Sequence, residues 1–134
     1  MRNIILVADP SEKNRAAFKE AFEGSFVVAE ADNEKKAISF ISDSSKKICA
    51  VLIDHALPGN GEFSVIKFME AIDQIGKFPI IFITPFNFDD EDAKEYDDEI
   101  DDIIEKPFSI DVAARRVRNL VELYNYKRSK TETI

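Results

Sequence analysis

The 134-residue sequence contains one cysteine, one histidine and no tryptophan. Cys49 has no second cysteine with which to form an internal disulfide or a cysteine-based zinc site, and its apolar neighbours indicate a packing role. No apolar run approaches the roughly 20 residues that a membrane-spanning helix needs. The first apolar run, residues 4–7, is too short for a secretory signal and leads into Asp9. We therefore expect a cytoplasmic protein that makes no contact with a membrane.

Basic residues are also scarce, since 18 lysines and arginines oppose 26 acidic residues and give a formal net charge of −8. Nucleic-acid phosphates require a basic face, so this balance argues against direct nucleic-acid binding. The acidic residues are unevenly placed, because residues 89–105 hold eleven carboxylates and one lysine. Such a run is typical either of a solvated helix face or of a surface for a specific partner.

Five short apolar runs alternate with stretches of helical spacing. The runs cover residues 4–7, 26–31, 50–54, 78–84 and 100–104, and the predicted helices cover 11–23, 34–42, 64–75, the acidic segment and a stretch from about residue 111. This alternation predicts an α/β fold of the doubly wound (βα)5 type, with a five-stranded parallel sheet between two helical layers. We assign residues 1–126 to one domain and residues 127–134 to a frayed polar tail or a truncated linker.

Four polar side chains come at or just after the ends of predicted strands: Asp9, Asp54, Thr84 and Lys106. In this fold class, sites form beyond the carboxyl ends of the strands. Two carboxylates suit Mg²⁺, a lysine and a hydroxyl suit a phosphoryl group, and an aspartate can act as the nucleophile. A simpler interpretation of Asp54 is that it only begins the turn at Pro58-Gly59. His55, beside it, is interpreted as an exposed loop residue.

The motifs at these strand ends carry a family resemblance. They are Ile4 to Asp9, Leu52-Ile53-Asp54 with Leu57-Pro58-Gly59, Ile80 to Thr84, and Glu105-Lys106-Pro107-Phe108. In this order and spacing they resemble a response-regulator receiver domain of two-component signalling, over essentially the whole chain. The resemblance implies a flavodoxin-like sheet with strand order 2-1-3-4-5 and a signalling domain that is not an enzyme beyond Mg²⁺-dependent self-phosphorylation and dephosphorylation.

The resemblance also implies a role for each site residue. Asp54 corresponds to the phosphoacceptor, and Mg²⁺ would be bound by Asp9, Asp54 and the backbone carbonyl of Ala56. Thr84 and Lys106 correspond to the switch hydroxyl and the phosphate-binding lysine, and the Lys106–Pro107 peptide bond is expected to be cis. The implied partners are a histidine kinase or phosphotransfer protein, and an output domain or partner that meets the acidic helix, the fifth strand and the last helix.

Three positions depart from the family pattern. Ala8 replaces an acid that usually orients metal-bound water, and outer-shell losses of this kind typically cost about 10- to 100-fold in affinity. Pro85 has no N–H to donate to a phosphoryl oxygen. Ile103 stands where the family has a switch aromatic residue. These departures favour a second hypothesis, a degenerate receiver that acts as a phosphorylation-independent interaction module. A phosphatase-type hydrolase is a more distant alternative, because no further acid or base is placed to turn over an intermediate.

The predicted last helix contains the basic cluster Arg115, Arg116 and Arg118. The helix resembles the last receiver helix of regulators that continue into an output domain, notably those that make or degrade cyclic di-guanylate. An ordinary amphipathic helix explains the pattern as well. In a homodimer through this face, the acidic segments would repel each other unless the arginines of the other copy faced them.

Overall fold

A central parallel sheet of five strands organises the chain, in the order β2-β1-β3-β4-β5. The computed structural model describes residues 1–59, 64–86 and 98–132. Its strands are β1 (Ile4–Ala8), β2 (Val27–Ala31), β3 (Ile48–Asp54), β4 (Ile80–Thr84) and β5 (Asp102–Glu105). Its helices are α1 (Glu12–Phe22), α2 (Glu34–Ser44), the 3-10 turn η1 (Ser45–Lys47), α3 (Ser64–Ala71) and α4 (Ile110–Glu132). The predicted α/β class and strand order are confirmed.

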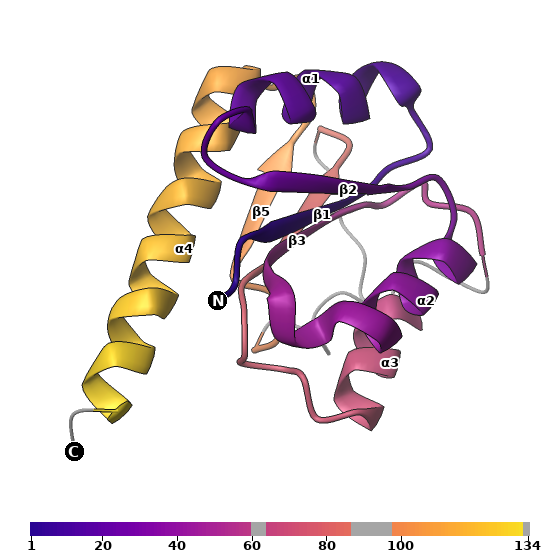
Figure 1. Cartoon of the computed structure of the whole chain (residues 1–134). Helices are drawn as coiled ribbons and strands as arrows, with labels where there is room; N and C mark the ends of the chain where they lie inside the picture. The colour runs from indigo at the N-terminus through magenta and orange to yellow at the C-terminus, as the bar shows by residue number, and fades with distance from the viewer. Residues whose placement is uncertain (60–63, 87–97, 133–134) are drawn as a thin grey trace.

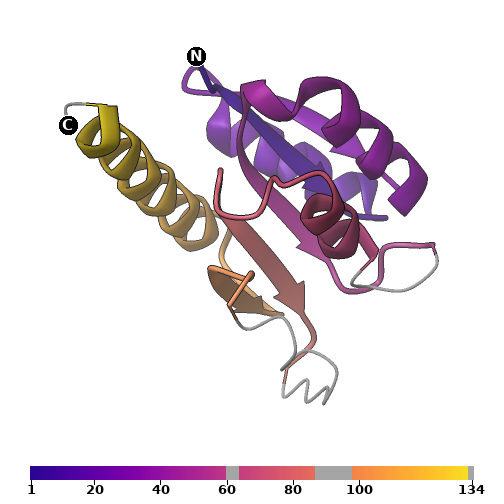
Figure 2. The ribbon, with the colours of Figure 1, turned by 90° about the horizontal axis from the view of Figure 1, so that it is seen from below.

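The helices form one layer on each face of the sheet. Figures 1 and 2 show α1 and α4 on one face, and α2 and α3 on the other. Each layer encloses its own apolar cluster, one centred on Phe18, Phe22 and Leu52 and the other on Ile53, Met69 and Phe82. Strand β3 lies in the middle and is buried along its whole length. Because its alternate side chains serve both clusters, a continuous run of apolar residues suits this strand.

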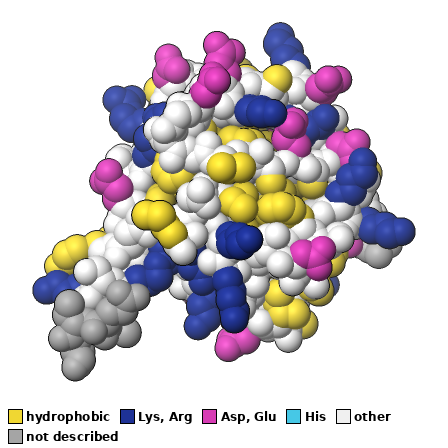
Figure 3. Space-filling view, viewed as in Figure 1, with side chains coloured by type: hydrophobic (Ala, Val, Ile, Leu, Met, Phe, Trp, Pro, Cys, Tyr) yellow, Lys and Arg dark blue, Asp and Glu magenta, His cyan; other side chains and the backbone are white. Residues whose placement is uncertain are grey.

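The edge strand β2 is more open, and Val27 on it is exposed. Figure 3 views this edge of the sheet, and apolar side chains gather near its centre, around β2. None of the helices in the described part of the chain combines the length and the apolar character that a membrane-spanning segment needs.

Helices α1 and α2 begin at side-chain caps. The Ser11 Oγ accepts the backbone N–H of Asn14 at 3.1 Å, and the Asn33 Oδ1 accepts that of Lys36 at 2.9 Å. Such contacts satisfy N–H groups that have no partner within the helix. The predicted cap at Ser11 is confirmed.

The predicted frayed tail and the predicted start of the fifth strand differ from the structure. Residues 127–132 continue α4 instead of fraying, and the Arg128 guanidinium in this stretch donates to the Lys77 carbonyl at 2.7 Å. The helix thus runs through residue 126, and the domain boundary there stays a prediction. Strand β5 begins at Asp102 rather than at Ile100, and Asp101 before it contacts Ile80 through both its backbone N–H and its carboxylate. Most of the acidic segment, with its predicted helix, lies outside the described residues.

Candidate functional site

The sheet brings the four predicted site residues to one edge, called here the carboxylate edge: Asp9, Asp54, Thr84 and Lys106. The strands are parallel, so their carboxyl ends face the same way. Backbone hydrogen bonds continue the ladder past the strand ends, with the Lys106 N–H donating to the Thr84 carbonyl at 2.8 Å. The predicted clustering at one edge therefore matches the observed geometry.

Asp54 is fully buried at the end of β3, with 0% of its surface exposed. The Ala56 backbone N–H donates to its Oδ1 at 2.8 Å. The Lys106 Nζ lies 2.7 Å from its Oδ2. Among the described residues, this Oδ2 has the ion pair but no hydrogen bond. Burying a carboxylate is costly unless its charge is compensated, so the ammonium group of Lys106 is central to this site.

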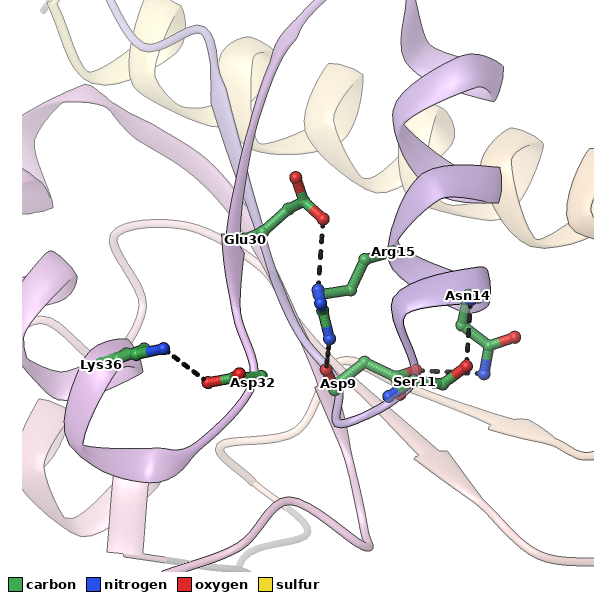
Figure 4. Close-up of polar contacts among 7 residues, drawn as sticks. All are labelled: Asp9, Ser11, Asn14, Arg15, Glu30, Asp32 and Lys36. Atoms are coloured by element: carbon green, nitrogen blue, oxygen red, sulfur yellow. Dashed lines mark hydrogen bonds and ion pairs between the residues drawn. The ribbon is translucent and has the colours of Figure 1, made fainter.

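Asp9, at the end of β1, is held by three donors from the start of α1 (Figure 4). The Ser11 N–H binds its Oδ1 at 2.8 Å and the Asn14 Nδ2 binds its Oδ2 at 3.3 Å. The Arg15 Nη1 donates to its backbone carbonyl at 2.8 Å. Burial raises the pKa of Asp9, partly opposed by the Ser11 hydrogen bond, and the nearby negative charge of Asp54 raises it further. A cation placed between the two carboxylates would favour their charged forms and so offset the rise in the pKa of Asp9.

Arg15 and Asn14 were not predicted as site residues from the sequence. Arg15 also pairs with Glu30 of β2, with Nε 3.1 Å from Oε1, so it fastens the end of β1 to α1 and β2. Asn14 could have been found from the sequence, because it lies three residues after the Ser11 cap. A side chain at this position can reach back to groups that precede the helix. The second ion pair in Figure 4, Asp32 with Lys36 at 3.0 Å, is an exposed contact within the start of α2.

The loop that follows Asp54 is fixed against α2. The Glu34 N–H donates to the Pro58 carbonyl at 2.8 Å, and the Glu34 side chain is buried over Gly59. A Cβ at Gly59 would lie 1.9 Å from the Glu34 Oε2 and 2.4 Å from its Cβ. Only glycine leaves room for this contact, so Glu34 helps to set the path of the loop beyond the site.

Thr84 is buried at the end of β4, whereas the Lys106 side chain is 37% exposed. The Lys106–Pro107 peptide bond is cis, as expected. The Phe108 ring then stacks on Phe18 of α1, with ring centroids 5.8 Å apart. The chain just after Lys106 is thus anchored by an aromatic contact, and the Lys106 ammonium lies beside Asp54.

The three departures have distinct surroundings. Ala8 is completely buried and supplies no polar group beside Asp9, and Pro85 follows β4 in a partly exposed position. Ile103 is 45% exposed on β5, and its carbonyl accepts the Arg116 Nη2 of α4 at 3.1 Å. Across residues 1–59, 64–86 and 98–132, no three side chains of the types His, Cys, Asp and Glu cluster as a metal-binding group. Within this part of the chain, the carboxylates that the structure places at the carboxylate edge are those of Asp9 and Asp54.

Comparison with known proteins identifies the family of this chain. Residues 5–118 match the family model of the response regulator receiver domain. A comparison with curated proteins finds no match.

Solved structures that resemble the chain include a CheY-like response regulator receiver domain from Methanospirillum hungatei, with 18% identity, a TM-score of 0.80, and coverage of 92% of this chain and 97% of that one. A response regulator from Thermotoga maritima has 25% identity and a TM-score of 0.70, over 91% of this chain and 99% of that one. NtrX from Brucella abortus, solved in complex with ATP, has 20% identity and a TM-score of 0.79, and this chain covers 30% of its length.

The family consists of phospho-accepting signalling domains, which generally bind Mg²⁺ at an acidic pocket and are linked to histidine kinases and output domains. Because the family model matches most of the sequence and the fold agrees with it, this chain belongs to the response-regulator receiver domains.

Proposed function

We propose that Asp54 accepts a phosphoryl group from a histidine kinase or phosphotransfer protein, in a Mg²⁺-dependent reaction, and that the chain passes this signal to an output domain or partner. One observation carries the proposal. The buried Asp54 carboxylate has Oδ1 bound to the Ala56 N–H at 2.8 Å, and Oδ2 lies beside the Lys106 ammonium at 2.7 Å without a hydrogen bond.

The Oδ2 atom is the oxygen that we assign as the nucleophile. It would form the new bond to phosphorus while the bond from phosphorus to the donor's histidine nitrogen breaks, and the electron pair would leave with the imidazole. The Lys106 ammonium would balance the charge on the phosphoryl oxygens, and the Thr84 hydroxyl would donate a hydrogen bond to one of them. Pro85 adds no further donor, since it has no N–H.

The residues present fit a divalent cation with oxygen ligands. Asp9 and Asp54 are two buried carboxylates at the ends of neighbouring strands, and carboxylate oxygens are ligands that Mg²⁺ takes. Asp9, Asp54 and the Ala56 carbonyl would hold the ion. Bound Mg²⁺ would supply positive charge that offsets the phosphoryl oxygens. Because Ala8 removes an acid, we expect weaker binding than in a receiver that keeps it.

The outgoing signal would use the β5–α4 face, defined here by Ile103, Val112 and Arg116. A groove of about 410 Å³ lies between these residues, Pro107 and Phe108. A phosphoryl group adds roughly −1.5 to −2 of charge, which would bias the backbone near Thr84 between two arrangements. We further propose that residues 1–126 form the receiver, that the rest of α4 leads toward an output domain, and that the protein works in the cytoplasm.

A second candidate function is a degenerate receiver that binds a partner without phosphorylation. The observation in its favour is the set of three departures at Ala8, Pro85 and Ile103, which removes an acid, a donor and an aromatic residue. We favour the phosphorylated form, because the nucleophile, a carboxylate ligand, the hydroxyl and the lysine all lie at one edge.

The test is covalent labelling by a small phosphodonor such as acetyl phosphate with Mg²⁺, followed by intact mass measurement. We expect wild type to be labelled and Asp54→Asn to be unlabelled, because the amide cannot act as the nucleophile. Asp32→Asn is the matched control, since this exposed carboxylate also follows a strand and should be dispensable. Labelling of Asp54→Asn would reject the assignment, and an unlabelled wild type would favour the interaction module.

A further inference from the structure

Asn14 lies against the Asp9 carboxylate, in a position set by the first turn of α1. Its backbone N–H is fixed on the Ser11 Oγ at 3.1 Å, and its Nδ2 lies 3.3 Å from the Asp9 Oδ2 (Figure 4). A polar side chain at this helix position often reaches back to the N–H of the capping residue. Here the Ser11 N–H already donates to the Asp9 Oδ1 at 2.8 Å, so the Asn14 amide turns to Asp9 instead.

The two contacts together fix the plane of the Asp9 carboxylate, because each of its oxygens receives one donor from α1. The carboxylate held in this way, Asp9, directly follows Ala8, which stands where the family usually has an acid. Ala8 is buried and apolar, and it cannot orient either Asp9 or a water on a metal. The amide of Asn14 has both a donor, Nδ2, and an acceptor, Oδ1, next to the same carboxylate.

We propose that Asn14 is a positioning residue for Mg²⁺ at Asp9 and takes over the outer-shell role that Ala8 cannot perform. Its Nδ2 holds Asp9 in place, and its Oδ1 is available to accept a hydrogen bond from a metal-bound water. Mg²⁺ usually keeps several of its waters, so groups that hold those waters or orient the ligands contribute to its affinity. This inference rests on the proposed function, since it assumes that Asp9 binds the ion.

The test is a Mg²⁺ titration without any phosphodonor, followed by amide NMR shifts or calorimetry, because the chain has no tryptophan to report binding. We expect Asn14→Ala to weaken the affinity about 10- to 100-fold, the usual range for an outer-shell partner. Asn14→Gln keeps the amide donor and acceptor, so it should retain more of the affinity than Asn14→Ala. Alanine is the better helix former, so Asn14→Ala should keep its fold, which thermal unfolding would verify.

The matched control is Lys13→Ala, a change to an exposed side chain in the same turn, which should leave the affinity unchanged. An Asn14→Ala protein that binds Mg²⁺ as wild type does, or an Asn14→Gln protein that binds no better than Asn14→Ala, would overturn the inference. A wild type that binds no Mg²⁺ would instead contradict the proposed function. The two failures are thus distinguishable in one series of titrations.

Discussion

The carboxylate edge and the β5–α4 face are held by different kinds of contact. At the edge, Asp9 and Asp54 are buried and their charges are met by specific donors and by Lys106. On the face, Ile103 and Val112 are exposed, and the Arg116–Asp102 ion pair is partly open to solvent. A buried charge leaves little freedom to change its surroundings, whereas an exposed contact is screened by water. The two regions therefore differ in how firmly their charges are fixed, although both carry atypical residues: Ala8 and Pro85 at the edge, and Ile103 on the face.

The comparison predicts large stability losses at the edge and small ones on the face. The largest is expected for Gly59→Ala, in the loop after Asp54, because the new Cβ would lie 1.9 Å from the Glu34 Oε2. We expect a loss of about 3 kcal/mol in the free energy of unfolding, at the upper end for an overpacked site. Urea denaturation would measure it.

A second change identifies the cause of that loss. Glu34→Gly in the Gly59→Ala background removes the clashing side chain and should restore most of the stability. Gly76→Ala is the control, because Gly76 has a φ of +83° but open space around it, so its cost comes from the backbone alone. Failure of Glu34→Gly to rescue Gly59→Ala would show that Glu34 does not fix this loop.

Lys106→Ala should come next, with a loss of about 2 kcal/mol. Removing one partner of a buried pair typically costs about 3–5 kcal/mol, and we expect less because the Lys106 side chain is 37% exposed. The measurement needs a chelator, since a cation at Asp54 would replace the lost charge. Adding Asp54→Asn to Lys106→Ala should recover stability by removing the unpaired carboxylate. A more damaging double variant would contradict this account of the edge.

Arg116→Ala should have the smallest effect, about 0.5–1 kcal/mol. The guanidinium makes two contacts to Asp102, at 2.8 and 2.5 Å, and one to the Ile103 carbonyl, but water reaches the pair. Urea denaturation beside Arg115→Ala, an exposed neighbour, would isolate these contacts. A loss above that of Lys106→Ala would show that the β5–α4 face is as constrained as the edge.

The sequence alone predicted the parallel sheet and the placement of Asp54 and Lys106 together, because parallel strands end at the same edge. It did not predict that Asn14 or Arg15 would contact Asp9, since those contacts depend on how the chain turns between β1 and α1. It also missed the helical course of residues 127–132, where Arg128 binds a carbonyl 51 residues away. Local patterns therefore located the strand ends, whereas the contacts to Asp9 depend on the turn after β1 and Arg128 makes a contact between distant segments.

In the proposed function, the carboxylate edge binds Mg²⁺ and a phosphoryl group and passes this signal to α4. The most direct measurement is a Mg²⁺ titration with and without beryllofluoride, a phosphoryl mimic, followed by amide NMR shifts. We predict saturable shifts at the carboxylate edge that spread to α4. Shifts confined to the edge would contradict the relay, and no response at millimolar Mg²⁺ would contradict the claim as a whole.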